Sequence, residues 1–474
     1  MTFTRLIKSA CLLLLLWTTD AAALDFTPCP DAPPQPGLRG SLCAKETVPL
    51  AWDGALPGEL TLFVRKFPAS GPSRGSVWLV AGGPGESGAS LYPFVDVLRR
   101  SFPGFDLIIP DHRGTGFSSR LCPKEEAPDS PGGTALAGAE WNSCFGVLDA
   151  QAPRARQFTI TNAARDLRRL IQQAHGGKPT YLYGVSYGTQ LVLRTLQLGP
   201  LPLAGVVLDS LVTLETAARW DLSQRSFVVD DIGRKVLAQC DADPACAQAM
   251  GLPTEAVYRR LLAKAAADPG VAARVPGKDL RRFLGALLDM PALRSRMPYL
   301  IRDLERGGHQ ELDTVLAGLP KLQGSLGDYP QTPPSIPLTG IISGSENNLR
   351  PGLNAAQVKR EEAGLLFTSS IPELLATSTL PTYPRNHWFG GHPAQLPPTL
   401  VLQGTLDPKT HYDGALDHIK VLRSGGPVHL VSVIDAPHFI LWVAPRCFEL
   451  HDFFRMIIFL LDFVRRTAYR IEII

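Results

Sequence analysis

Excess charge of one sign is nearly absent from this sequence of 474 residues. Its 47 Lys and Arg residues face 44 Asp and Glu residues, which leaves a formal net charge of +3. No long run of Lys or Arg is present to follow a phosphate backbone, so the sequence excludes nucleic acid as an expected partner. Internal repeats and low-complexity tracts are also missing, and a chain that is 45% hydrophobic and 19% charged is typical of a globular protein.

A hydrophobic run long enough to span a bilayer is missing near the N-terminus. The apolar run at residues 10–17 is well short of the ~20 residues that a spanning helix needs. Arg5 and Lys8 precede it and alanines 21–23 follow it, which is the layout of a secretory signal peptide. We therefore predict a signal peptide at residues 1–23, removed after Ala23, and a secreted or periplasmic protein. The alternative is an uncleaved anchor.

Cysteine is scarce, and no pair has the spacing of a zinc finger. Removal of the signal peptide leaves seven cysteines, of which six lie close together in pairs. The pairs are Cys29 with Cys43, Cys122 with Cys144, and Cys240 with Cys246. We predict three disulfides, which agrees with export, and an unpaired Cys447. In the competing interpretation all are buried thiols.

Short apolar runs bounded by turn residues predict strands, and amphipathic stretches between them predict helices. The predicted strands cover residues 60–67, 77–81, 107–110, 181–184, 206–209, 400–404 and 429–433, and one helix follows a predicted N-cap at Thr161. This alternation predicts an α/β fold with a mostly parallel sheet flanked by helices.

From residue 215 to residue 380 helical patterns dominate, which predicts an inserted helical cap. Residues 24–214 and 381–474 would then form the two parts of the core, and Pro- and Gly-rich loops are predicted at 318–337 and 381–398. The apolar tail from Phe448 predicts a closing helix on the sheet, with membrane or partner contact as the less favoured alternative.

The strongest chemical signal is Gly184-Val-Ser186-Tyr-Gly188, which follows a predicted strand and precedes a predicted helix. A Gly-x-Ser-x-Gly turn in this context is the nucleophile elbow of the α/β-hydrolase fold. The alternative is a tight strand-to-helix turn without chemistry. We predict that Ser186 is the nucleophile.

A serine nucleophile needs a histidine base and a carboxylate that orients it, and in this fold they follow the serine in the order Asp, His. Asp407 follows the predicted strand at 400–404, and His438 follows the strand at 429–433. Both are therefore expected at the carboxyl edge of the sheet. We predict Ser186, Asp407 and His438 as a catalytic triad.

Acyl transfer also requires N–H donors for the oxyanion. The amide of Tyr187, directly after the nucleophile, supplies one. The second is expected from Gly82-Gly-Pro-Gly85; because Pro84 has no N–H, Gly83 or Gly82 must donate, and we favour Gly83. The loop lacks the lysine of a phosphate-binding loop. No metal and no cofactor is predicted.

Four stretches together resemble the α/β-hydrolase peptidase family that contains proline iminopeptidases and bacterial tripeptidyl aminopeptidases. They are Gly82–Gly85, Asp111-His-Arg-Gly-Thr-Gly-Phe-Ser118, Gly184–Gly188 and Gly404-Thr-Leu-Asp-Pro408. The resemblance covers most of the sheet-forming chain but not the cap. Within it we interpret Asp111 and Arg113 as residues that shape a loop.

The resemblance implies a secreted exopeptidase that acts on the N-terminus of peptides, with an acidic residue of the cap paired with the substrate ammonium. Glu346 is the candidate from its position. The sequence departs from the family pattern at Ala81, where histidine is frequent, at Pro437, where glycine is common, and in its apolar tail.

Two other functions compete with the aminopeptidase. A carboxylesterase or lipase needs the same triad and oxyanion donors. A non-catalytic binding module would be expected to have a broken triad, whereas all three members are present. Dehalogenases and epoxide hydrolases need an aspartate in the elbow, and Ser186 excludes them.

Overall fold

The computed structural model describes residues 23–324, 327, 329–448 and 471–473. The predicted signal peptide, apart from Ala23, lies outside the described residues, and so does most of the apolar tail. Within the described part of the chain, no helix combines the length and the hydrophobicity needed to cross a bilayer.

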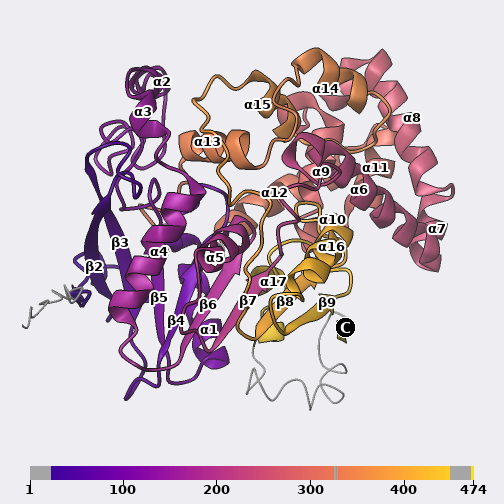
Figure 1. The fold of residues 1–474 in the computed structure, drawn as a ribbon. Coiled ribbons are helices and arrows are strands. Elements are labelled where there is room, and N and C mark those ends of the chain that lie inside the picture. The colour runs from indigo at the N-terminus through magenta and orange to yellow at the C-terminus, as the bar shows by residue number, and fades with distance from the viewer. Residues whose placement is uncertain (1–22, 325–326, 328, 449–470, 474) are drawn as a thin grey trace, which may run out of the picture.

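The described strands form one mixed sheet (Figure 1). They are β1 (Thr27–Pro28), β2 (Leu42–Pro49), β3 (Glu59–Phe67), β4 (Ser76–Val80), β5 (Asp106–Asp111), β6 (Thr180–Val185), β7 (Gly205–Asp209), β8 (Thr399–Gly404), β9 (Val428–Val433) and β10 (Ile471–Ile473). Their order in the sheet is β1-β2-β3-β5-β4-β6-β7-β8-β9-β10. All seven predicted strands are present, whereas the sequence interpretation missed β1, β2 and β10.

The centre of the sheet is parallel, as predicted. Neighbours from β5 to β9 pair in parallel, and β1, β2, β3 and β10 pair antiparallel at the two sides. Every residue of β4 and β7 is buried. A strand covered on both faces reads as a continuous apolar run, which explains why these strands are visible in the sequence.

Helices cover both faces of the sheet. On one face α4 (Ile160–Ala174), α5 (Tyr187–Gln197) and α16 (Tyr412–Leu422) share a hydrophobic cluster with the strands. On the other face α1 (Val95–Ser101) and α17 (Ile440–Val443) share a second one. The remaining helices of this part are α2 (Glu140–Ala150) and α3 (Ala152–Ala155).

The predicted cap of α4 at Thr161 is wrong. The helix begins two residues earlier, and Thr159 is its N-cap, because the Thr159 side chain accepts the N–H of Asn162 at 3.0 Å.

The chain between β7 and β8 is helical and gathers on one side of the sheet (Figure 1). Its helices are α6 (Arg225–Ala242), α7 (Pro244–Met250), α8 (Thr254–Ala267), α9 (Leu280–Leu287), α10 (Pro291–Arg294), α11 (Met297–Glu305), α12 (Gln310–Gly324), α13 (Ile336–Glu346), α14 (Ala355–Glu362) and α15 (Ile371–Thr377). Helices α6 to α11 pack around a hydrophobic cluster of their own, which α12 also joins. By contrast, α13 packs into the cluster of the sheet through Leu338, Ile341 and Ile342.

The predicted loop at 318–337 is partly wrong, because α12 continues to Gly324 with Pro320 inside the helix. The predicted disulfides are all present: Cys29–Cys43, Cys122–Cys144 and Cys240–Cys246. Cys447 is a buried free thiol.

Candidate active site

Ser186 occupies a sharp turn between β6 and α5. Its φ of 55° and ψ of −126° lie outside the regions that L-residues adopt comfortably. A Cβ on Gly184 would lie 2.5 Å from the carbonyl oxygen of Gly188, and one on Gly188 would lie 2.5 Å from that of Val80. Both positions therefore require glycine, and the turn presents Ser186 at the carboxyl edge of the sheet.

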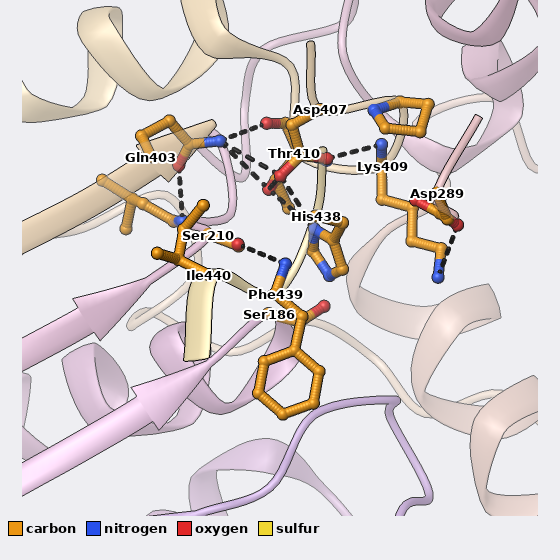
Figure 2. Close-up of polar contacts among 12 residues, drawn as sticks. Ser186, Ser210, Asp289, Gln403, Asp407, Lys409, Thr410, His438, Phe439 and Ile440 are labelled. Carbon is orange, nitrogen blue, oxygen red and sulfur yellow. Dashed lines mark hydrogen bonds and ion pairs between the residues drawn. The ribbon is translucent and has the colours of Figure 1, made fainter. Parts of the chain in front are cut away.

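The structure brings Asp407 and His438 together from the ends of β8 and β9 (Figure 2). Nδ1 of His438 lies 2.8 Å from Oδ2 of Asp407. Asp407 is fully buried and His438 nearly so. This contact leaves Nε2 of the imidazole as the nitrogen that can exchange a proton with a serine hydroxyl.

Asp407 accepts further hydrogen bonds from its own loop and strand. The backbone N–H groups of Lys409 and Thr410 donate to Oδ1 at 2.7 and 2.8 Å, and the Thr410 hydroxyl and the Gln403 amide donate to Oδ2 at 2.7 and 3.2 Å. Burial alone would raise the pKa of Asp407, but the interaction with His438 and these hydrogen bonds outweigh it and lower the pKa. Asp407 therefore stays ionised.

A second buried carboxylate, Asp209, holds the loop that carries His438. Its two oxygens accept the N–H groups of Ile440 and Leu441, each at 2.9 Å. The hydroxyl of Ser210 accepts the N–H of Phe439 at 2.8 Å, and Phe439 has a φ of 64° (Figure 2). Sequence reasoning missed Asp209 and Ser210, and their place at the end of β7 beside the nucleophile strand is the signal that could have found them.

Of the glycines in the predicted oxyanion loop between β4 and α1, Gly82 and Gly83 lie in the cavity wall beside Ser186. The carboxylate of Glu86 accepts a hydrogen bond from the backbone of Gly82, and Pro84 has no N–H. Gly83, with a φ of 109°, is therefore the glycine whose N–H is left for a substrate. Tyr187 is the first residue of α5, where N–H groups have no partner within the helix.

One cavity of about 730 Å³ contains these groups: Ser186, His438, Gly83 and Tyr187 all line it. Its wall also includes α6, α9 and α13, so the core and the helical segment both face the site. The charged side chains that line it are Glu86, Glu215, Asp221, Asp289, Arg225, Arg282 and Lys409.

Glu346 is not among the residues that line this cavity. It is 2% exposed, and one carboxylate oxygen lies 3.6 Å from Nη2 of Arg194. Burial raises its pKa, and Tyr383 donates a hydrogen bond to it. The structure thus places Glu346 among buried side chains, outside the residues that line the cavity.

The Asp-His-Arg-Gly stretch makes loop contacts. Asp111 accepts the N–H groups of Gly88 and Phe117 at 2.7 and 2.9 Å. Arg113 forms a buried two-pronged ion pair with Asp166, with contacts of 2.6 and 2.7 Å. Both residues shape the loops beside the oxyanion loop, and neither lines the cavity.

Residues 75–283 match the alpha/beta hydrolase fold family. The chain has the α/β-hydrolase fold. The parallel sheet, the elbow at the end of β6 and the helical insertion before β8 of this α/β hydrolase agree with the match. The resemblance found in the sequence is confirmed at this level.

Relatives of this α/β hydrolase include a peptidase. "Serine protease Hip1" of Mycobacterium tuberculosis is 31% identical over 206 residues, and the match covers 40% of this chain and 39% of the relative. The protein of the same name from Mycobacterium bovis matches equally. The match thus spans well under half the length of these relatives, and it supports a hydrolase.

Two of the solved structures with low similarity to this chain are a proline iminopeptidase and a putative lipase. The proline iminopeptidase of Mycobacterium smegmatis is 15% identical, with 86% of this chain and 95% of that chain covered and a TM-score of 0.35. A putative lipase of Acinetobacter baumannii is 14% identical, with 85% and 88% covered and a TM-score of 0.34.

Proposed function

We propose that this α/β hydrolase is an exported serine aminopeptidase of prolyl or tripeptidyl type. The observation that carries the proposal is the Asp407–His438 contact in the cavity that Ser186 also lines. A strained serine, an oriented imidazole and a buried carboxylate are the parts that acyl transfer by a serine needs.

In the proposed reaction Oγ of Ser186 attacks the carbonyl carbon of the scissile bond while Nε2 of His438 takes the hydroxyl proton. The amides of Gly83 and Tyr187 hold the oxyanion. His438 then gives the proton to the departing amine as the C–N bond breaks, and water hydrolyses the acyl-enzyme by the same route. Asp407 keeps the imidazole in one tautomer throughout.

Peptides with a free N-terminus are favoured as substrates over neutral esters by the charges of the cavity. Four carboxylates line it against three Lys and Arg side chains. The similarity to a mycobacterial serine protease supports the same choice. Because Glu346 lies outside the cavity, the acid that meets the ammonium is expected among the four that line it.

Export is supported by three disulfides, since such bonds persist in oxidising compartments. The signal peptide remains the sequence prediction on which this part of the proposal depends.

The test is hydrolysis by purified mature protein of prolyl, alanyl and tripeptidyl anilides, their N-acetylated forms, and short and long acyl esters. We expect turnover of the free-amine anilides and its loss in Ser186→Ala, with an unchanged circular dichroism spectrum as the control for folding. Turnover of esters alone would make the protein a carboxylesterase.

A further inference from the structure

Glu86 is a carboxylate in an unusual place for an enzyme that must stabilise an oxyanion. It follows the Gly82–Gly85 loop directly and lines the cavity. A Cβ built on Gly82 would lie 3.1 Å from Cβ of Ser186 and 3.3 Å from Oε2 of Glu86. The Glu86 carboxylate and the side chain of Ser186 therefore both lie close to the same glycine.

The other acids of the cavity already have close partners. Asp289 lies 2.9 Å from Nζ of Lys409, and Glu215 lies 2.8 Å from Nη2 of Arg194. Asp221 accepts the Ser223 hydroxyl at 2.6 Å and the N–H of Leu349 at 2.5 Å.

Glu86 differs from them. No Lys or Arg nitrogen of the described chain lies within 4 Å of its carboxylate, and its pKa is raised by burial, an effect that Lys409, His438 and the Gly82 amide only partly oppose. Glu86 is half-buried, and a partly desolvated carboxylate without an ion-pair partner gains from a cation that enters with the substrate. Among the described acids of the cavity, Glu86 has this property and also the position beside Ser186.

The position determines which cation fits. The α-ammonium of a substrate residue is two bonds from that residue's carbonyl carbon, so a carboxylate beside the nucleophile can reach the ammonium of the residue under attack. In a tripeptidyl substrate the ammonium lies two residues further away, up to ~7 Å. Glu86 is thus placed for an acyl group of one residue.

We propose that Glu86 binds the α-ammonium of the residue whose carbonyl Ser186 attacks, so that the enzyme releases single N-terminal residues and rejects blocked ones. This inference rests on the proposed aminopeptidase function. Without the ammonium, the negative charge of Glu86 opposes the negative charge that develops on the oxyanion held by Gly83 and Tyr187. When the substrate ammonium is bound, it lies between the Glu86 carboxylate and the oxyanion and offsets their repulsion. The free amine then takes part in catalysis as well as in binding.

The experiment compares wild type and Glu86→Gln on three anilides that differ only at the N-terminus: alanyl, N-acetylalanyl and propionyl, which lacks the amine. For wild type we expect the alanyl anilide to be the best substrate. In Glu86→Gln we expect kcat/KM for the alanyl anilide to fall by about 10- to 100-fold, while kcat for the acetylated and propionyl anilides rises. A loss of activity on the alanyl anilide together with a gain on the other two anilides distinguishes ammonium recognition from general damage to the site.

Asp289→Asn is the matched control, because it removes another carboxylate of the same cavity that is already paired with Lys409. Asp289→Asn should change kcat/KM for the alanyl anilide and kcat/KM for the propionyl anilide by the same factor. If Glu86→Gln lowers kcat/KM equally for all three substrates, the proposal is overturned, even if the wild-type protein proves to be an aminopeptidase.

A measurement on wild type alone covers the case in which Glu86→Gln does not fold. The alanyl anilide should exceed both the propionyl and the Ala-Ala-Ala anilide in kcat/KM by at least about tenfold. A preference for the tripeptidyl anilide would leave the aminopeptidase function standing and refute the role of Glu86. Hydrolysis of esters without any free-amine anilide would instead refute the proposed function itself.

Discussion

The hydroxyl of Thr410 is predicted to help orient Asp407, the proposed catalytic carboxylate. It is one of five described donors to Asp407, and it shares Oδ2 with His438, whose Nδ1 lies 3.3 Å from Oγ1 of Thr410. A hydrogen bond to a charged group contributes about 1.5–3 kcal/mol. If all of it acts in the transition state, Thr410→Val lowers kcat by about 10- to 150-fold, since 1.36 kcal/mol corresponds to a factor of ten.

The assay is kcat and KM of Thr410→Val on the best anilide substrate, with Thr410→Ser as the matched control that keeps the hydroxyl. We expect kcat to fall with KM nearly unchanged in Thr410→Val, and Thr410→Ser to stay within a few-fold of wild type. An equal loss in both variants, or no loss in Thr410→Val, would refute the reasoning.

The same substitution carries a pH signature in stability. The pKa of Asp407 is lowered in the folded state, so its ionisation contributes stability above the unfolded value of about 3.9, and that stability is lost as the pH falls through the folded value. Because the Thr410 hydroxyl favours the charged form, Thr410→Val raises this pKa. The stability difference from wild type should be full at neutral pH and shrink in acid, as measured by chemical denaturation at both.

Two predictions concern stability away from the triad. Arg113→Met leaves Asp166 buried without its ion-pair partner, so the free energy of unfolding should fall by about 3–5 kcal/mol. Lys420→Met removes an exposed ion pair instead and should change the free energy of unfolding by less than about 1 kcal/mol. Equal effects of the two substitutions in denaturant titrations would contradict this prediction. Replacing Cys122 and Cys144 by alanine removes a disulfide with a sequence separation of 22. The protein should lose about 3 kcal/mol of stability, seen as a lower thermal midpoint. An unchanged midpoint would argue against a disulfide at these positions.

The central strands and the order of the triad could be predicted because local sequence determines them. Strands buried on both faces are continuous apolar runs, and the loops that follow β8 and β9 carry Asp407 and His438 directly behind those runs. The disulfides were predictable for a similar reason, since each pair is close in sequence. The missed strand β2 mixes buried and exposed residues, and it gives no such run.

What the sequence did not show depends on contacts between distant segments. Gln403 and Thr410 become supports of Asp407 only when the loop after β8 folds back on its strand. Glu346 was chosen from its place near the end of the predicted cap, but α13 packs into the cluster of the sheet and Glu346 is buried beside Arg194. Glu86 was not predicted as a site residue, because the sequence does not show that its side chain lies near Ser186 in the folded protein.

The central claim, that Ser186 is a nucleophile activated by His438 and Asp407, is tested most directly by covalent labelling. The protein would be treated with a serine-directed fluorophosphonate, and the modified peptide located by mass spectrometry. We predict a single adduct at Ser186, abolished in Ser186→Ala and slowed by orders of magnitude in His438→Ala. A protein that stays unlabelled, or labelling at the same rate in both variants, would contradict the account.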